Sequence, residues 1–187
     1  MRHLRLLIAL TMLLTVAPDA RGQDPSASSE YLIKAGFIYN FANLVQWPQT
    51  AFAQPDSPIV IGILGEDPFG AVIDHALEGK KVNGRGFVIK RLKSASDLNE
   101  CHILYVSSAD ITNPGEILHS LKGLPILTIG EMPGFAKRGG IINLVLDNER
   151  VRFEVNIDAA KQADLNISSR LLALAKIIQP VADGRAR

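Results

Sequence analysis

Hydrophobic residues along this chain form short continuous runs, and segments with apolar residues at helical spacing lie between those runs. Three of the runs contain aliphatic and β-branched residues without polar alternation: 59–64, 102–106 and 124–129. This pattern is typical of strands that are buried on both faces of a parallel sheet. A fourth strand is predicted at 87–92.

The segments between these strands carry the start and stop signals of helices. One predicted helix opens at Asp67-Pro68 and ends at Gly79, and another opens at Asn113-Pro114 and ends at Gly123. Strands that alternate with helices predict an α/β fold. We expect one domain with a wound, mostly parallel sheet and helices on both faces, followed by an antiparallel hairpin and a terminal helix.

The first predicted helix is apolar around much of its circumference. Ser28 or Ser29 is placed to cap it, Glu30 and Lys34 are spaced for an ion pair, and Trp47-Pro48 ends it. Its apolar residues form two adjacent stripes: Ile33, Phe37, Phe41 and Leu44, and Leu32, Ala35, Tyr39 and Ala42. Such a helix is expected to be deeply packed or to cover a partner.

Two strands, 141–146 and 151–156, are too close in sequence for a crossover and are expected to pair as an antiparallel hairpin. If Asn148-Glu149 is the loop, Leu144 lies opposite Phe153. The same register gathers four polar side chains on one face: Asn143, Arg152, Glu154 and Asn156.

This polar face of the hairpin has two interpretations. It binds a protein partner, or it holds the terminal helix through Arg170. The second, structural interpretation is favoured by the residues. The terminal helix is expected to be capped by Ser168, with apolar residues at helical spacing until Pro180.

The N-terminus has the pattern of a secretory signal peptide. Arg2 and Arg5 precede an apolar run over 6–16, and small residues around Gly22 fit a peptidase site. A membrane-spanning helix needs about 20 apolar residues, so a permanent anchor is disfavoured. We therefore expect a signal peptide over 1–22, a polar leader over 23–29, one domain over 30–180, a flexible tail over 181–187, and a periplasmic location.

Charge and cysteine content exclude several classes of function. The chain has 20 basic and 19 acidic residues, and cleavage after residue 22 removes three basic and one acidic, which leaves 17 and 18. A near-neutral protein lacks the positive charge needed to hold nucleic acid. Cys101 is the single cysteine, so an intrachain disulfide is impossible, and it is expected to be a buried, inert thiol.

No set of residues has the spacing of a catalytic, metal or cofactor site. The loop 65–70 follows a strand and opens a helix, but it lacks the glycine and lysine pattern of phosphate-binding loops. The three histidines of the domain lie in separate elements, which disfavours a metal site. A crevice at the carboxyl ends of the strands is the expected place for a small ligand, lined by Glu66, Ser107, Ser108 and Glu131.

Three stretches resemble the YfiR family of exported regulatory proteins. The first is YLIKAGFIYNF at 31–41, continued to Trp47-Pro48, and the second is CHILYV at 101–106. The third combines LTIGE at 127–131, PGF at 133–135, GGIIN at 139–143 and VRFEVN at 151–156. Their order and spacing cover nearly the whole chain after the predicted signal peptide.

The resemblance implies a non-enzymatic, homodimeric periplasmic regulator without cofactor. Such a regulator represses the periplasmic portion of an inner-membrane diguanylate cyclase or a similar sensor receptor, and thereby limits cyclic di-GMP signalling and biofilm formation. An outer-membrane lipoprotein is the implied releasing partner. The family's disulfides cannot form here, so redox control within the chain is not expected. Two alternatives remain open: an exported small-ligand binder that uses the crevice, and an exported hydrolase that uses Ser107 or Glu131.

Overall fold

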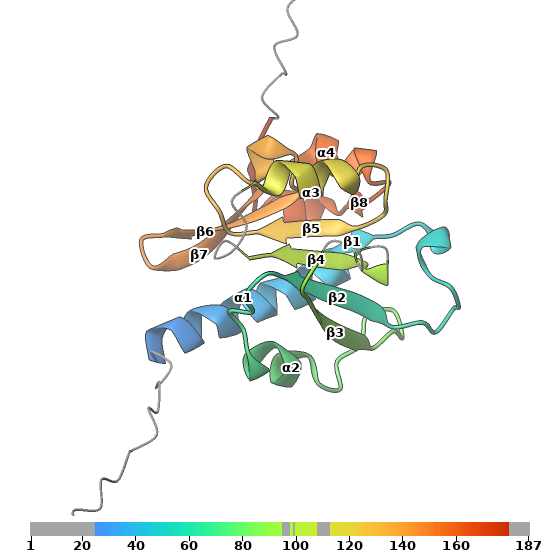
Figure 1. Cartoon of the computed structure of the whole chain (residues 1–187), viewed down its shortest axis with the longest axis horizontal. Helices are drawn as coiled ribbons and strands as arrows, with labels where there is room; N and C mark the ends of the chain where they lie inside the picture. Colours follow the sequence, from blue (N-terminus) through green and yellow to red (C-terminus); the bar gives the residue numbers. More distant parts are fainter. Residues whose placement is uncertain (1–24, 95–97, 99, 108–112, 180–187) are drawn as a thin grey trace, which may run out of the picture.

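Seven strands form one sheet in the computed structural model, which describes residues 25–94, 98, 100–107 and 113–179 (Figure 1). The spatial order of the strands is β3-β2-β4-β5-β6-β7-β9. Their bounds are β2 Ile59–Leu64, β3 Phe87–Leu92, β4 Ile103–Val106, β5 Leu127–Gly130, β6 Ile142–Asp147, β7 Arg150–Val155 and β9 Lys176–Ile177.

Parallel pairing dominates this sheet, which confirms the predicted fold class. The strands from β3 to β6 pair in parallel, β6 and β7 pair antiparallel, and β9 lies parallel to β7. The chain passes from β2 to β3 on one side and then to β4 on the other side of β2. The carboxyl ends of β2 and β4 therefore flank the switch in strand order, the usual ligand crevice of such sheets.

Helices cover both faces of the sheet. The long helix α1, Pro25–Leu44, and α2, Ala71–Leu77, pack on one face over the larger apolar core, and α3, Pro114–Ser120, packs on the other. The shorter elements are β1 Val45–Gln46, η1 Gln49–Ala51, η3 Ala136–Arg138, α4 Ile157–Gln162, β8 Asn166–Ile167 and α5 Ser169–Leu172. β1 and β8 form a separate two-stranded ladder that joins the end of α1 to the C-terminal region.

The hairpin has the register that the sequence predicts. Leu144 lies opposite Phe153, and Asn143 lies opposite Glu154. The two loop residues, Asn148 and Glu149, both have positive φ angles, 48° and 61°. A two-residue turn of this kind matches the twist of the strands and fixes their register.

Three predicted boundaries are wrong. Helix α2 begins at Ala71 with Gly70 as its cap, so Asp67-Pro68 lies in the turn before it, where the Asp67 carboxylate accepts a 2.8 Å hydrogen bond from the N–H of Phe69. Helix α1 begins at Pro25, so Ser28 and Ser29 lie inside it rather than at its cap. The terminal helix α5 is capped by Ser168 as predicted, but it ends at Leu172 rather than near Pro180. The chain after it joins the edge of β7 as β9, where backbone hydrogen bonds of the sheet replace those of a helix.

The glycine-rich loop between β5 and β6 is built around Phe135, whose ring is fully buried. A Cβ atom at Gly130 or Gly140 would lie within 2.8 Å of that ring, so only glycine allows this packing. The packing fixes the start of the loop, and with it the position of Glu131.

No helix in the described part of the chain is long and apolar enough to cross a membrane. The predicted signal peptide over 1–22, the tail over 181–187 and Ser108 lie outside the described residues.

Candidate functional site

The carboxyl ends of β2, β4 and β5 meet at one edge of the sheet, where open α/β folds bind ligands. β4 leads into Ser107, and β5 leads into Glu131. The N-terminal half of α1 reaches the same place, because Tyr31 and Lys34 both contact Glu131.

Lys34 is the centre of a charged cluster with Glu30, Tyr31 and Glu131, which we call the Lys34 cluster. Its Nζ atom lies 2.5 Å from Oε1 of Glu30 and 2.5 Å from Oε2 of Glu131. The Tyr31 hydroxyl donates a hydrogen bond of 3.1 Å to Oε1 of Glu131. The Lys34 side chain is only 6% exposed, so these partners replace water around its charge.

Burial and the partners of Lys34 act on its pKa in opposite directions. Burial lowers the pKa of Lys34, but the hydrogen bonds to Glu131 and Glu30 outweigh burial and raise the pKa above its ordinary value. The side chain is therefore a permanent cation near neutral pH, and it partly neutralises the two carboxylates.

Two tyrosines complete the surroundings of Glu131. Burial first, and the charge of Glu131 second, raise the pKa of Tyr31 to about 12. Tyr105 is fully buried, and the same two causes raise its pKa. The ring of Phe69 packs edge-on against both tyrosine rings, with centroids 5.2 Å from Tyr31 and 4.8 Å from Tyr105.

This chemistry suits anchoring better than catalysis. The protonated lysine and the neutral tyrosines are not activated nucleophiles near neutral pH, and the two carboxylates are engaged by Lys34. The cluster joins α1 to the loop after β5, which is 97 residues away from Lys34 in the sequence. Its clearest physical effect is to hold the N-terminal half of α1 on the sheet.

The structure brings only part of the predicted crevice together. Glu131 lies in the Lys34 cluster. Ser107 is buried at the end of β4, where its backbone N–H donates a 3.0 Å hydrogen bond to the carbonyl of Leu64. Glu66 is exposed in the loop after β2 and forms no hydrogen bond or ion pair with that cluster within the described residues. The ligand-binding role of these residues stays a prediction.

The polar residues of the hairpin are largely internal. Asn143 donates a 3.1 Å hydrogen bond to Oε2 of Glu154, and Lys176 of β9 lies 2.9 Å from Oε1 of the same carboxylate. Burial raises the pKa of Glu154, but the hydrogen bonds from Lys176 and Asn143 outweigh it and lower the pKa. Lys176, rather than Arg170, therefore joins the C-terminal segment to the hairpin.

The other predicted members of this face are separated from Glu154. The Asn156 side chain donates to the carbonyl of Ala136 and accepts from the N–H of Ala159, so it caps α4. Arg152 is exposed and lies 3.7 Å from Asp147. Arg170 is exposed on α5 and forms no ion pair within the described residues.

Large apolar side chains are exposed where α1 and the hairpin project. Leu32 and Ile33 on α1 are 55% and 49% exposed, and Leu146 on β6 is 58% exposed. The first turns of α1 and the tip of the hairpin extend at the same end of the molecule (Figure 1). We call the surface with Ile33 and Leu146 the hairpin end. Leu32 instead lines a groove with Val72 and Ala76 of α2.

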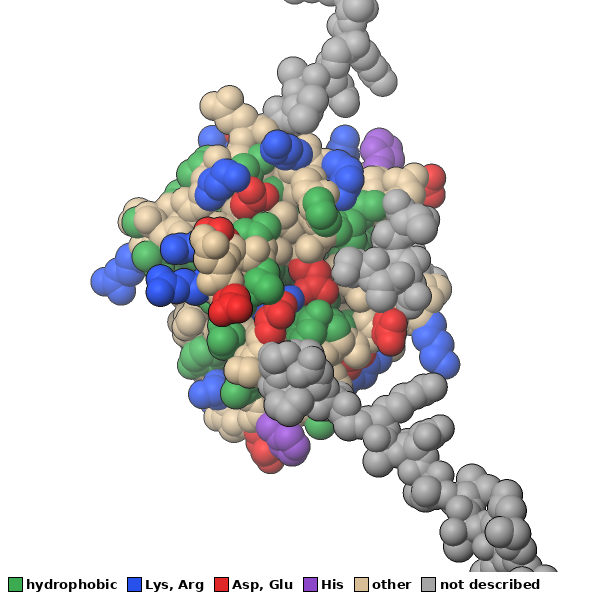
Figure 2. All heavy atoms as spheres, turned by 90° about the vertical axis from the view of Figure 1, so that its left-hand side faces the viewer, with side chains coloured by type: hydrophobic (Ala, Val, Ile, Leu, Met, Phe, Trp, Pro, Cys, Tyr) green, Lys and Arg blue, Asp and Glu red, His purple; other side chains and the backbone are tan. Residues whose placement is uncertain are grey.

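Figure 2 looks at this end of the molecule. Hydrophobic side chains lie among acidic groups in the middle of the face, and basic side chains gather toward its left margin. Exposed apolar groups that are rimmed by polar ones are typical of protein-binding surfaces.

The histidines do not form a metal centre in the described part of the chain, where no group of three potential ligands occurs. His102 has a structural role. Its Nδ1 atom accepts from the N–H of Val60 at 3.0 Å, and Nε2 lies 3.0 Å from the carbonyl of Ala51. Its ring also stacks on Phe52 at 4.3 Å.

The sequence predicted the pair between Glu30 and Lys34 and placed Asn143 beside Glu154, but it did not predict the other partners of Glu131 and Glu154. Tyr31 and Tyr105 lie in the family-like stretches, yet no pattern placed them beside Glu131, and no pattern marked Lys176. The one available signal was Lys34 itself, because a lysine on a helix that is apolar around much of its circumference needs a counter-charge where it is buried. Its partner Glu131 lies 97 residues away, beyond any local pattern.

The chain was also compared with models of known protein families. The model described as YfiR/HmsC-like matches residues 31–176. The match includes Lys34, Tyr31 and Glu131 of the Lys34 cluster, but not Glu30. It also includes both strands of the hairpin and Lys176.

Proposed function

The chain belongs to the YfiR/HmsC-like family, and from this premise we propose that it is a periplasmic regulator of cyclic di-GMP signalling. It binds the periplasmic portion of an inner-membrane diguanylate cyclase, or of a similar receptor, and keeps that receptor inactive. The nucleotide is made in the cytoplasm and does not contact this chain. The protein acts by association and performs no reaction of its own.

The observation that carries this proposal is the hairpin end. The exposed side chains of Ile33 and Leu146 bring apolar area to one end of a well-packed domain. Their burial against a receptor would contribute roughly 25 cal/mol for each Å² of apolar surface removed from water.

The foundation of this surface is rigid, which favours binding because little conformational entropy is lost. Below the exposed residues, the rings of Phe37 and Phe41 pack on Phe153 of the hairpin with centroids 5.6 and 5.1 Å away. The Lys34 cluster holds the same part of α1 from its other side. The helix and the hairpin are therefore held in one fixed arrangement.

Arg152 extends the proposed contact surface, whereas Arg170 lies on α5, whose cap Ser168 is hydrogen-bonded to Leu44 at the C-terminal end of α1. Of the polar residues predicted to meet a partner, Asn143 and Asn156 are each 1% exposed, whereas Arg152 and Arg170 are exposed. Arg152 is weakly paired with Asp147, so it is available to an acidic group of the receptor or of an outer-membrane lipoprotein that releases the regulator.

Co-purification from membranes tests the proposal. The tagged, exported protein is expected to retain one membrane cyclase or sensor receptor. Leu146→Glu should reduce that retention at least tenfold, because it places a charge in the apolar contact. Leu174→Glu is the matched control: Leu174 is 75% exposed on the C-terminal segment, and this variant should retain the receptor like the wild type.

Both variants should melt near the wild-type temperature, since both leucines are exposed. The proposal is wrong if no membrane protein is retained by the wild type. The assignment of the hairpin end is wrong if Leu146→Glu and Leu174→Glu retain equal amounts of receptor.

A further inference from the structure

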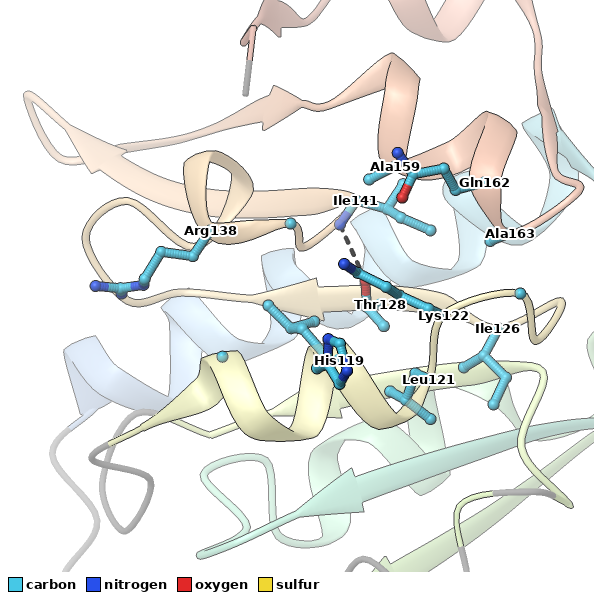
Figure 3. A pocket seen from close by; sticks show the side chains of 14 residues that line it. His119, Leu121, Lys122, Ile126, Thr128, Arg138, Ile141, Ala159, Gln162 and Ala163 are labelled. Atoms are coloured by element: carbon cyan, nitrogen blue, oxygen red, sulfur yellow. Dashed lines mark hydrogen bonds between the residues drawn. The ribbon is translucent and has the colours of Figure 1, made fainter. Parts of the chain in front are cut away.

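A small cavity lies between α3 and α4, on the face of the sheet opposite α1 (Figure 3). Its volume is about 130 Å³. The apolar part of its wall is aliphatic and includes Leu118, Leu121, Ile126 and Ala163. This cavity is distinct from the crevice that the sequence predicts at the carboxyl ends of the strands.

The ionisable side chains around this cavity are all of basic residues. His119, Lys122 and Arg138 line it, and no aspartate or glutamate does. Arg138 donates a 2.7 Å hydrogen bond to the carbonyl of Pro133, and its guanidinium points away from the cavity (Figure 3). The Lys122 side chain instead runs across the cavity toward β5. Lys122 has no ion-pair partner within the described residues.

A buried donor lies on the floor of the cavity. The Oγ1 atom of Thr128 accepts a 2.9 Å hydrogen bond from the N–H of Ile141. A threonine hydroxyl also carries one hydrogen, and no acceptor for it occurs in the described part of the structure. Thr128 is 4% exposed, so a group that enters the cavity is the natural acceptor of this hydrogen.

We propose that the cavity binds a short aliphatic carboxylate. The carboxylate accepts hydrogen bonds from the Thr128 hydroxyl and from Nζ of Lys122, and the hydrocarbon chain packs on Leu118, Ile126 and Ala163. An apolar cavity of about 150 Å³ holds a benzene molecule. A cavity of this size therefore limits the hydrocarbon part to about four to six carbons. This site is independent of the receptor surface proposed above.

Titration with pentanoate, followed by NMR of the ¹⁵N-labelled mature protein, tests the site. We expect saturable shifts in the amides of Lys122, Thr128, Ile141 and Ala159 at millimolar concentrations. Pentylamine, which has the same chain and the opposite charge, should cause no saturable shift. Equal shifts with pentylamine, or no saturation by pentanoate, would overturn the proposal and leave a cavity that holds only water.

Three variants separate charge from volume. Lys122→Met should weaken pentanoate binding two- to fivefold, because an exposed ion pair contributes a binding free energy of that size. Lys161→Met on α4 is the matched control and should bind pentanoate like the wild type. Ala159→Leu, which fills the cavity from α4, should weaken binding by about tenfold or more. Each variant is first checked for an unchanged amide spectrum away from the cavity. Wild-type affinity in both Lys122→Met and Ala159→Leu would contradict the assigned site.

Discussion

At Lys34 a single ammonium group meets two carboxylates beneath the first helix. The residue is nearly inaccessible to water, and its partners come from its own helix turn and from the loop after β5. A local pattern could reveal Glu30, four residues away, but not Glu131. The sequence therefore indicated that Lys34 is paired, and only the fold could show that the pair anchors α1 to the sheet.

Lys34→Met is expected to lower the free energy of unfolding by about 3 kcal/mol, because it leaves Glu131 buried without its counter-charge. Lys161→Met, which removes an exposed lysine, should change it by less than about 0.5 kcal/mol. Urea denaturation of both variants checks this. Equal stabilities would mean that the Lys34 cluster contributes nothing net to the fold.

Glu154→Gln tests the structural role of the hairpin carboxylate. The loss of the ion pair with Lys176 should lower the free energy of unfolding by less than about 1 kcal/mol, since Lys176 is largely exposed. It should also speed hydrogen exchange of the Ile178 amide, which donates to the carbonyl of Val155 beside β9.

A different result for Glu154→Gln would reopen the partner-binding interpretation. If exchange at Ile178 and the melting temperature stay unchanged while receptor retention is lost, Glu154 contacts the partner. Lys176→Met provides the comparison, because it breaks the same pair from the exposed side.

At the scale of elements, patterns that are local in sequence were predictable, and those set by distant partners were not. Alternation and a two-residue turn fixed the register of the hairpin. The predicted extent of the terminal helix was wrong. The apolar residues after Leu172 can also be buried by a strand, and the edge of β7 gives Lys176 and Ile177 such a strand partner. The short ladder of β1 and β8 had no pattern of its own.

The aromatic contact between α1 and the hairpin should dominate their packing energy. Phe41 is fully buried, and Phe37 is partly exposed. Phe41→Ala is expected to cost about 3 to 5 kcal/mol, and Phe37→Ala less. Leu174→Ala, at an exposed site, should change stability by under about 0.5 kcal/mol. Chemical denaturation ranks the three, and a larger loss for Phe37→Ala would contradict this packing.

The segment between β1 and β2 should respond to acid through His102. Burial is the main cause that lowers the pKa of His102 below its ordinary value, and the positive charge of Arg85 lowers it further. The hydrogen bond with Ala51 raises this pKa but does not outweigh burial. A histidine whose pKa is lowered on folding stabilises the protein fully above its unfolded pKa of about 6.5. This stability is lost as the pH falls below that value.

His102→Asn keeps an acceptor near the N–H of Val60 and removes the titrating ring. We expect the free energy of unfolding of the wild type to fall between pH 7 and pH 5 more steeply than that of His102→Asn. His75→Asn, at an exposed histidine, should follow the wild type. Identical pH profiles for His102→Asn and the wild type would show that His102 does not carry this dependence.

At the scale of the whole molecule, family membership, a wound α/β domain and an apolar projecting end fit a regulator that works by association. The fold class followed from the order of strands and helices. The receptor surface did not, because it depends on how far α1 and the hairpin project beyond the core. Export and the implied homodimer stay predictions, and intact mass of the exported protein should give an N-terminus at or near Gln23.

The level of cyclic di-GMP in cells that lack this gene tests the central claim most directly. Deletion should raise the nucleotide, and the exported protein should lower it again. A version without residues 1–22, retained in the cytoplasm at equal abundance, should have no effect. Equal repression by the cytoplasmic and the exported forms, or no rise on deletion, would contradict control of a receptor from the periplasm.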